Sequence, residues 1–175
     1  PTVNGITYKD IDSSVVAITG NNQQIVQNKS NLQVNYEQAT PNYSAGRITK
    51  YSFELNGVIK ESTAAGGSVT FGTIDSANDL TLTLTVTDSR GLTATKSITS
   101  PMLAHSNPTA NVVLERLNNY EDEVYLTVDA SISSIDGKNT MTIKYRYKLS
   151  DEDYTSFVTI PNNETQTLSL DKSKI

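Results

Sequence analysis

The sequence of 175 residues has no cysteine, no tryptophan and a single histidine, His105. Without cysteine the chain forms no disulfide and has no thiolate nucleophile, and one histidine cannot supply the usual ligand sets of zinc. No apolar run approaches the roughly 20 residues of a membrane-spanning helix. Lys and Arg number 14 against 19 Asp and Glu, a net charge of −5 that disfavours binding to nucleic acid. We therefore predict no cofactor, no nucleic-acid partner and no membrane span.

A strict alternation of apolar and polar residues dominates the stretch 80–100, which begins L-T-L-T-L-T-V-T. Period two places one set of side chains on a core face and the other set toward solvent. Asp88 can accept hydrogen bonds from backbone N–H groups ahead of it, and Gly91 can take the positive φ that closes a turn. The returning strand at 92–99 is expected to share one face among Leu92, Ala94 and Ile98. Because such a hairpin has one dry face, it requires a covering sheet, which predicts a β-sandwich.

Residues 1–103 are predicted to form an immunoglobulin-like β-sandwich of about seven strands. Besides the hairpin, extended segments are expected as two pieces within 1–18 and at 32–36, 48–55, 58–61 and 68–74. The side chains expected to face inward are Leu32, Val34, Tyr36, Tyr51 and Phe53. Asn56-Gly57 is typical of a type I′ hairpin turn. No helical period is recognised in this part of the sequence.

Residues 104–175 are predicted to form a second β-sandwich module, of immunoglobulin or fibronectin-III type. Pro101 and Pro108 bracket a predicted linker, because proline fixes φ and removes a ladder donor. Five strands are expected, at 112–117, 124–128, 141–149, 157–160 and 167–170, with a turn at 135–138. This part has no counterpart of the 80–99 hairpin, and the sequence begins with Pro1 rather than Met. We therefore expect a piece of a longer protein whose second module is truncated, with a small complete five-stranded fold as the alternative.

Candidate catalytic and metal-ligating residues are sparse. His105 neighbours Ser106 in the predicted linker, where no third group is expected to hold a base in place. Acidic clusters at 10 and 12, at 121–123 and at 151–153 could in principle serve glycoside hydrolysis or bind calcium. Each lies at a predicted turn, where acids are ordinarily solvated, and none follows the spaced calcium-loop pattern. The sequence therefore predicts no catalytic, cofactor-binding or metal-binding residue and no enzyme.

Tyrosine concentrates in the second module. Exposed tyrosines can stack on sugars or anchor protein contacts. The tyrosines of this part are Tyr120, Tyr125, Tyr145, Tyr147 and Tyr154. Alternation along 141–149 places Tyr145 and Tyr147 on one strand face with Met141, Ile143 and Leu149, which favours a core position for those two.

Several of these stretches resemble a known family. The segment 86–91, V-T-D-S-R-G, is similar to the closing hairpin of many bacterial and phage immunoglobulin-like modules. I-T-G-N-N at 18–22 and S-N-L-Q-V at 30–34, followed by Y-S-F-E at 51–54, resemble the immunoglobulin-like modules of minor structural proteins in siphophage tails. Phages of that kind infect Gram-positive bacteria. K-Y-R-Y at 144–147 is similar to the central strand of a following module.

The resemblance implies a non-enzymatic component of a virion tail, near the tail tip or baseplate and extracellular once assembled. Such modules act as spacers or attach to the host surface, so the implied partners are other tail proteins, a second copy or host cell-wall polysaccharide. Two alternatives remain. One is a bacterial cell-surface adhesin or stalk, and the other is an accessory carbohydrate-binding module of a secreted hydrolase, which the lack of tryptophan weakens. Fold alone does not choose among them, because β-sandwiches host all three functions.

Overall fold

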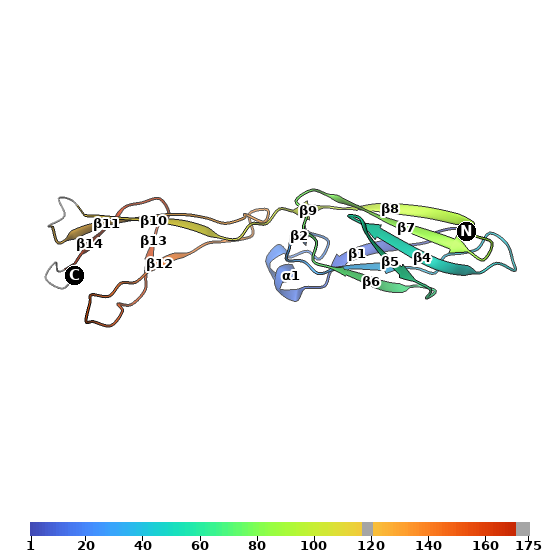
Figure 1. Ribbon diagram of the computed structural model, residues 1–175, viewed down its shortest axis with the longest axis horizontal. Coiled ribbons are helices and arrows are strands. Elements are labelled where there is room, and N and C mark those ends of the chain that lie inside the picture. The colour runs from blue at the N-terminus through green and yellow to red at the C-terminus, as the bar shows by residue number, and fades with distance from the viewer. Residues whose placement is uncertain (117–120, 171–175) are drawn as a thin grey trace. The chain divides into compact units, whose positions relative to one another are not determined.

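The computed structural model describes residues 1–116 and 121–170, and Figure 1 labels its helix and all of its strands except β3. The chain divides into two compact units, unit 1 from Pro1 to His105 and unit 2 from Ser106 to Ile175. Strands dominate both units, and every sheet of three or four strands is antiparallel. The predictions for Leu117 and for the loop residues 118–120 lie outside the described residues.

Unit 1 is a sandwich of two antiparallel sheets, with strand orders β1-β3-β6 and β5-β4-β7-β8 (Figure 1). Two short strands, β2 and β9, form an additional parallel pair. The predicted all-β sandwich is confirmed for this unit. Its elements are β1 (Ile6–Asp10), α1 (Ser13–Thr19), β2 (Ile25–Val26), β3 (Leu32–Tyr36), β4 (Ile48–Leu55), β5 (Val58–Ser62), β6 (Gly67–Gly72), β7 (Leu80–Asp88), β8 (Thr93–Ser100) and β9 (Met102–Leu103).

The alternation of β7 separates core from solvent, as predicted. Leu82, Leu84 and Val86 are at most 1% exposed and belong to the hydrophobic core of the unit. The threonines between them lie on the opposite, solvated face, where Thr83 and Ser97 of β8 share a hydrogen bond of 2.9 Å. Because β7 pairs with β4 on one side and β8 on the other, its apolar residues lie in the middle of the sheet.

Three aromatic rings join the two sheets at the centre of unit 1. The ring of Tyr36 on β3 lies 4.9 Å from that of Tyr51 and 4.8 Å from that of Phe53, both on β4. Both tyrosine hydroxyls are paired despite their burial. Tyr51 accepts from the Ala39 N–H at 3.0 Å, and Tyr36 donates to Ser62 Oγ at 2.6 Å. The predicted inward orientation of these residues is confirmed, and the rings add apolar contact without leaving a polar group unsatisfied.

The prediction of a second extended piece within 1–18 is wrong, because residues 13–19 form the helix α1. Asp12 caps its start by accepting from the N–H groups of Ser14 and Val15. Gly20 ends it with φ of +67° and donates its N–H to the Val16 carbonyl. The segment is rich in β-branched residues, which suggests a strand, but an aspartate N-cap and a left-handed glycine C-cap favour one short helix.

The linker prediction for 101–108 is wrong at its beginning, because Met102 and Leu103 form β9 alongside β2. Met102 is only 7% exposed, and its N–H donates to an oxygen of Asp79 at 3.0 Å. Leu92 also departs from its predicted place on the inner face of the return strand. It lies in the turn before β8, where its N–H donates to Asp88, and its side chain is 51% exposed.

Unit 2 pairs a three-stranded sheet of order β10-β11-β14 with the two-stranded β12-β13 (Figure 1). Its strands are β10 (Thr109–Arg116), β11 (Glu123–Ser131), β12 (Ile143–Tyr145), β13 (Val158–Ile160) and β14 (Gln166–Ser169). The core between the sheets consists of Val124, Leu126, Val128, Ala130, Ile160 and Leu168, with Ile143, Tyr145 and Leu170 packed against it. This core is much smaller than that of unit 1.

The prediction of one strand over 141–149 is wrong in extent, because β12 covers only three of those residues. Its partner β13 is equally short, and beyond Tyr145 the chain bonds irregularly through Thr155, whose N–H donates to the Tyr147 carbonyl at 2.8 Å. Met141 is 36% exposed, contrary to its predicted core position. The predicted turn at 135–138 is confirmed, because Ile135, Asp136 and Gly137 all take positive φ.

Leu84→Ala should lower the free energy of unfolding of unit 1 by about 2–5 kcal/mol, since it removes a fully buried side chain from the core. Thr85→Ala, the adjacent change on the solvated face, should change it by no more than about 1 kcal/mol, the span of strand propensity. Denaturant unfolding of the two variants measures both values. Equal losses would contradict the assignment of the two faces of β7.

Candidate functional site

The acidic cluster at 10 and 12 is structural. Asp10 is 3% exposed at the end of β1, and one of its oxygens accepts from the N–H groups of Asp12 and Asn31, each at 2.9 Å. The prediction that this cluster is a solvated turn is therefore wrong for Asp10. The Ser14 hydroxyl and the N–H groups of Val15 and Ser14 lower the pKa of Asp12, because they stabilise its charged form. Both carboxylates serve the backbone rather than a reacting group.

The other two acidic clusters, 121–123 and 151–153, are exposed, as predicted. In the part of the chain that the structure describes, no three His, Asp or Glu side chains lie close enough to hold a metal ion together. His105 is half-buried, and its backbone N–H donates to Gln27 Oε1 at 3.1 Å. The Ser106 hydroxyl shares a hydrogen bond of 3.1 Å with the Ser133 hydroxyl, so the partner of this candidate nucleophile is another serine.

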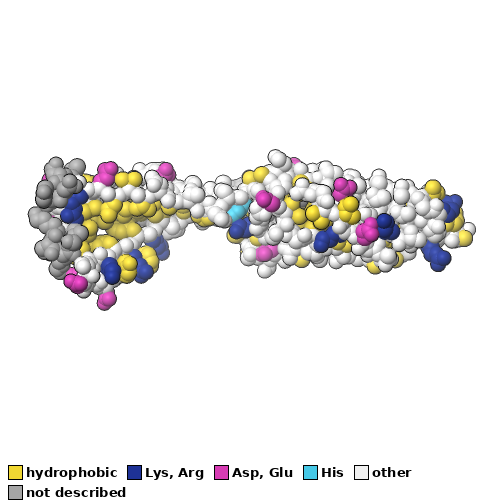
Figure 2. All heavy atoms as spheres, viewed as in Figure 1, with side chains coloured by type: hydrophobic (Ala, Val, Ile, Leu, Met, Phe, Trp, Pro, Cys, Tyr) yellow, Lys and Arg dark blue, Asp and Glu magenta, His cyan; other side chains and the backbone are white. Residues whose placement is uncertain are grey.

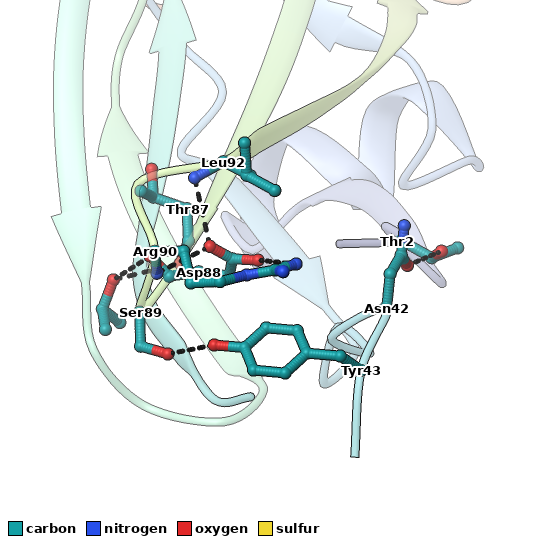
Figure 3. Close-up of polar contacts among 9 residues, drawn as sticks. Thr2, Asn42, Tyr43, Thr87, Asp88, Ser89, Arg90 and Leu92 are labelled. Carbon is teal, nitrogen blue, oxygen red and sulfur yellow. Dashed lines mark hydrogen bonds and ion pairs between the residues drawn. The ribbon is translucent and has the colours of Figure 1, made fainter. Parts of the chain in front are cut away.

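The buried carboxylate of Asp88 organises the turn between β7 and β8. Asp88 is 1% exposed, and its Oδ1 accepts from the N–H groups of Arg90 and Leu92 at 2.9 and 3.1 Å (Figure 3). Gly91, with φ of +81°, donates its N–H to the Asp88 carbonyl at 2.9 Å. The roles predicted for Asp88 and Gly91 are both confirmed.

The charge of Asp88 is stabilised in spite of its burial. Desolvation favours the neutral acid, but the two backbone N–H groups and the positive charge of Arg90 more than offset it. The pKa of Asp88 therefore lies below its ordinary value. The guanidinium of Arg90 lies 3.7 Å from the other carboxylate oxygen. It also lies 3.7 Å from the ring centroid of Tyr43, whose hydroxyl bonds to Ser89 at 2.7 Å (Figure 3).

A basic-aromatic patch lies on unit 2, formed by Arg146, Lys148, Tyr154 and Phe157. The guanidinium carbon of Arg146 lies 4.4 Å from the ring centroid of Tyr154 and 4.8 Å from that of Phe157. The Lys148 Nζ lies 5.7 Å from the Tyr154 ring. Tyr154 and Phe157 are 56% and 60% exposed. Figure 2 shows basic and hydrophobic side chains intermixed at the lower edge of this unit.

The register of β12 with β13 brings Arg146 next to Phe157. Tyr145 pairs with Val158, so the next pair outward along the two chains is Arg146 and Phe157. Alternation places Arg146 and Lys148 on the outer side, whereas Tyr145 and Tyr147 are partly buried. Phe157 was not among the predicted candidates. Its only sequence signal is its position next to a strand that pairs with K-Y-R-Y, and pairing cannot be read from the sequence alone.

The described tyrosines of unit 2 have different environments. Tyr154 is exposed in the basic-aromatic patch, and Tyr145 packs against the core of the unit. Tyr125 donates its hydroxyl to Glu123 at 3.2 Å, and this hydrogen bond is the main cause of its raised pKa. Tyr120 lies outside the described residues. The predicted core orientation of Tyr145 is confirmed, and Tyr154 is the tyrosine best placed to contact another molecule.

Comparison with known proteins identifies the family. A family model described as "Siphovirus protein of unknown function (DUF859)" matches residues 1–168. The chain belongs to this siphovirus family. No curated protein matches it. Among solved structures, the siphovirus protein is similar to fibronectin(III)-like modules of Clostridium thermocellum CbhA, with 14% identity and a TM-score of 0.36 over 83% of this chain and 73% of that one.

The family confirms one part of the sequence prediction, namely that this is a siphophage protein. The immunoglobulin-like tail module and the Gram-positive host stay predictions. Among the residues described for the siphovirus protein, no helix has the length and apolar character needed to span a bilayer.

Asp88→Asn should lower the unfolding temperature of unit 1 at pH 7, because the charged acceptor of two backbone N–H groups becomes neutral. The folded-state pKa of Asp88 is depressed, so its ionic contribution is present above the unfolded pKa of about 3.9 and is lost as pH falls through the folded pKa. The difference from the wild type should therefore shrink as pH falls below about 4. Thermal scans between neutral and strongly acidic pH measure it.

The control is Glu54→Gln, which neutralises an exposed carboxylate on the outer side of β4. It should unfold close to the wild type at both ends of the pH range. A gap for Asp88→Asn that stays constant down to the lowest pH would contradict an ionised Asp88 in the native turn.

Proposed function

We propose that this siphovirus protein is a non-enzymatic structural module of the virion tail, near the tail tip or baseplate, and that it attaches to the host surface. The observation that carries the attachment role is the basic-aromatic patch of unit 2. Family membership supports a virion component and favours it over a bacterial adhesin, a stalk or a hydrolase module. The protein would then be extracellular once the virion is assembled.

The composition of the patch suits an anionic polysaccharide of the Gram-positive cell wall. Exposed faces and edges of Tyr154 and Phe157 offer apolar surface to sugar rings. Arg146 and Lys148 add positive charge beside those rings, and a guanidinium can bind an anionic group in a bidentate manner. The whole chain is acidic, with a net charge of −5, so it should repel an anionic polymer elsewhere. Contact would therefore concentrate at Arg146 and Lys148, away from the exposed acids 151–153 that precede Tyr154.

The buried carboxylates support a structural rather than a catalytic chain. Among the described residues, Asp10 and Asp88 are the carboxylates withdrawn from solvent. One oxygen of each accepts two backbone N–H groups, so these acids hold the ends of β1 and β7 in place. A general acid or base would instead face a substrate. The stiff two-sheet core of unit 1 suits a spacer that carries a binding surface.

The chain should bind saturably to whole Gram-positive cells, and purified cell-wall polysaccharide should abolish the binding. Combining Arg146→Ala with Tyr154→Ala should weaken the binding at least about tenfold, because the pair supplies the guanidinium and one of the two exposed rings of the patch. Cell pull-down with labelled protein, repeated at increasing polysaccharide concentration, measures both effects.

Unit 1 offers a matched control in Tyr43 and Arg90, another stacked tyrosine-arginine pair on the surface. Combining Tyr43→Ala with Arg90→Ala removes the same two side-chain types and should leave cell binding unchanged. Equal losses for the two double variants would contradict attachment through the patch. Absence of binding by the folded wild-type chain would contradict attachment to the host. The remaining role would be that of a spacer that contacts other tail proteins or a second copy.

A further inference from the structure

The five strands of unit 2 repeat the arrangement of five strands of unit 1. The sheet β10-β11-β14 has the same order as β1-β3-β6, and both are antiparallel throughout. The pair β12-β13 likewise corresponds to β4-β5, and the five strands follow the same order along the chain. In unit 1 the next elements are β7 and β8. No described residue of unit 2 forms their counterpart.

In unit 1 this hairpin covers β1. Strand β7 pairs with the edge of β4 that faces away from β5, and β8 continues the sheet toward β1. Leu82 and Leu84 share a core cluster with Ile6 of β1, which is only 6% exposed. The Lys96 ammonium of β8 also donates to the Asn4 carbonyl, just before β1, at 2.9 Å.

The equivalent strand of unit 2, β10, is left uncovered. Val112 pairs with Val128, and Leu114 pairs with Leu126. Residues opposite one another in an antiparallel pair point to the same face, so Val112 and Leu114 point to the core side. Their partners on β11 are each 6% exposed, yet Val112 and Leu114 are 59% and 61% exposed. The apolar face of the β10-β11-β14 sheet therefore extends onto β10, beyond the part that β12 and β13 cover.

Two hollows lie along this uncovered face. One of about 430 Å³ is lined by Leu114, Val124, Leu149 and Leu170 among others. The second, of about 490 Å³, is lined by Ala110, Val128, Met141 and Ile143 among others. Figure 2 shows hydrophobic side chains open to view along this unit. The edge of β12 away from β13 is also unpaired among the described residues, whereas the same edge of β4 pairs with β7.

We propose that a β-hairpin following β14 in the polypeptide completes unit 2. It pairs with the free edge of β12 and lays an apolar face over Val112 and Leu114. In unit 1 only residues 73–79 separate β6 from β7, so a short connection after β14 brings the hairpin to this place. The segment carries alternating apolar and polar residues, as β7 does. A hairpin of the same chain is favoured over a second copy because the equivalent strand of unit 1 is covered in that way, by β7 and β8.

The test compares residues 1–175 with the chain extended through the next two strands of its natural reading frame. In the extended chain, the β12 N–H groups that face away from β13 should exchange with solvent at least about 100-fold more slowly than in 1–175. Val112→Ser and Leu114→Ser should lower the unfolding temperature of unit 2 in the extended chain and have little effect in 1–175. Hydrogen exchange and thermal scans give these readouts.

Val113→Ser is the matched control, because Val113 lies between the two test residues and points to the opposite face. It should have little effect in either chain. Unchanged exchange at β12 on extension would overturn the proposal, as would equal effects of all three serine variants. Sedimentation of 1–175 distinguishes a second copy as the cover. A dimer that Val112→Ser dissociates would also overturn the proposal, whereas a monomer supports it.

Discussion

The structure depends on one constraint, which is that a sheet with a dry face must be covered by another apolar layer. In unit 1 the covered face is that of β7, where Leu82, Leu84 and Val86 meet the ring cluster of Tyr36, Tyr51 and Phe53. Burial of such side chains is the main favourable term in folding. The chain has no disulfide that could replace it. The stability of each unit therefore follows from how completely its apolar face is covered.

Features that depend on neighbouring residues could be predicted from the sequence. The alternation of β7, the Asn56-Gly57 turn with both residues at positive φ, and the Asp88 turn all follow from short-range chemistry. Two failures have different causes: the caps of α1 are short-range signals that were outweighed by the β-branched residues between them, whereas β9 depends on a distant partner. Asp12 and Gly20 convert a β-branched segment into α1, and β2 draws Met102 into a strand just past Pro101. Local propensity cannot anticipate such pairing.

The candidate site shows the same limit. Tyrosines of unit 2 were recognisable as possible contact residues, and alternation separated the inward Tyr145 and Tyr147 from the outward cations. The meeting of Arg146 with Tyr154 and Phe157 depends on the register of β12 with β13 and on the irregular chain beyond it.

Native-state hydrogen exchange on the single chain 1–175 tests the dependence of stability on cover most directly, because each unit serves as the reference for the other. Amides of β3, β4 and β7 should exchange at least about 100-fold more slowly than those of β10, β11 and β12. Equal protection of the two units would contradict it, since a half-covered face would then be as stable as a closed one.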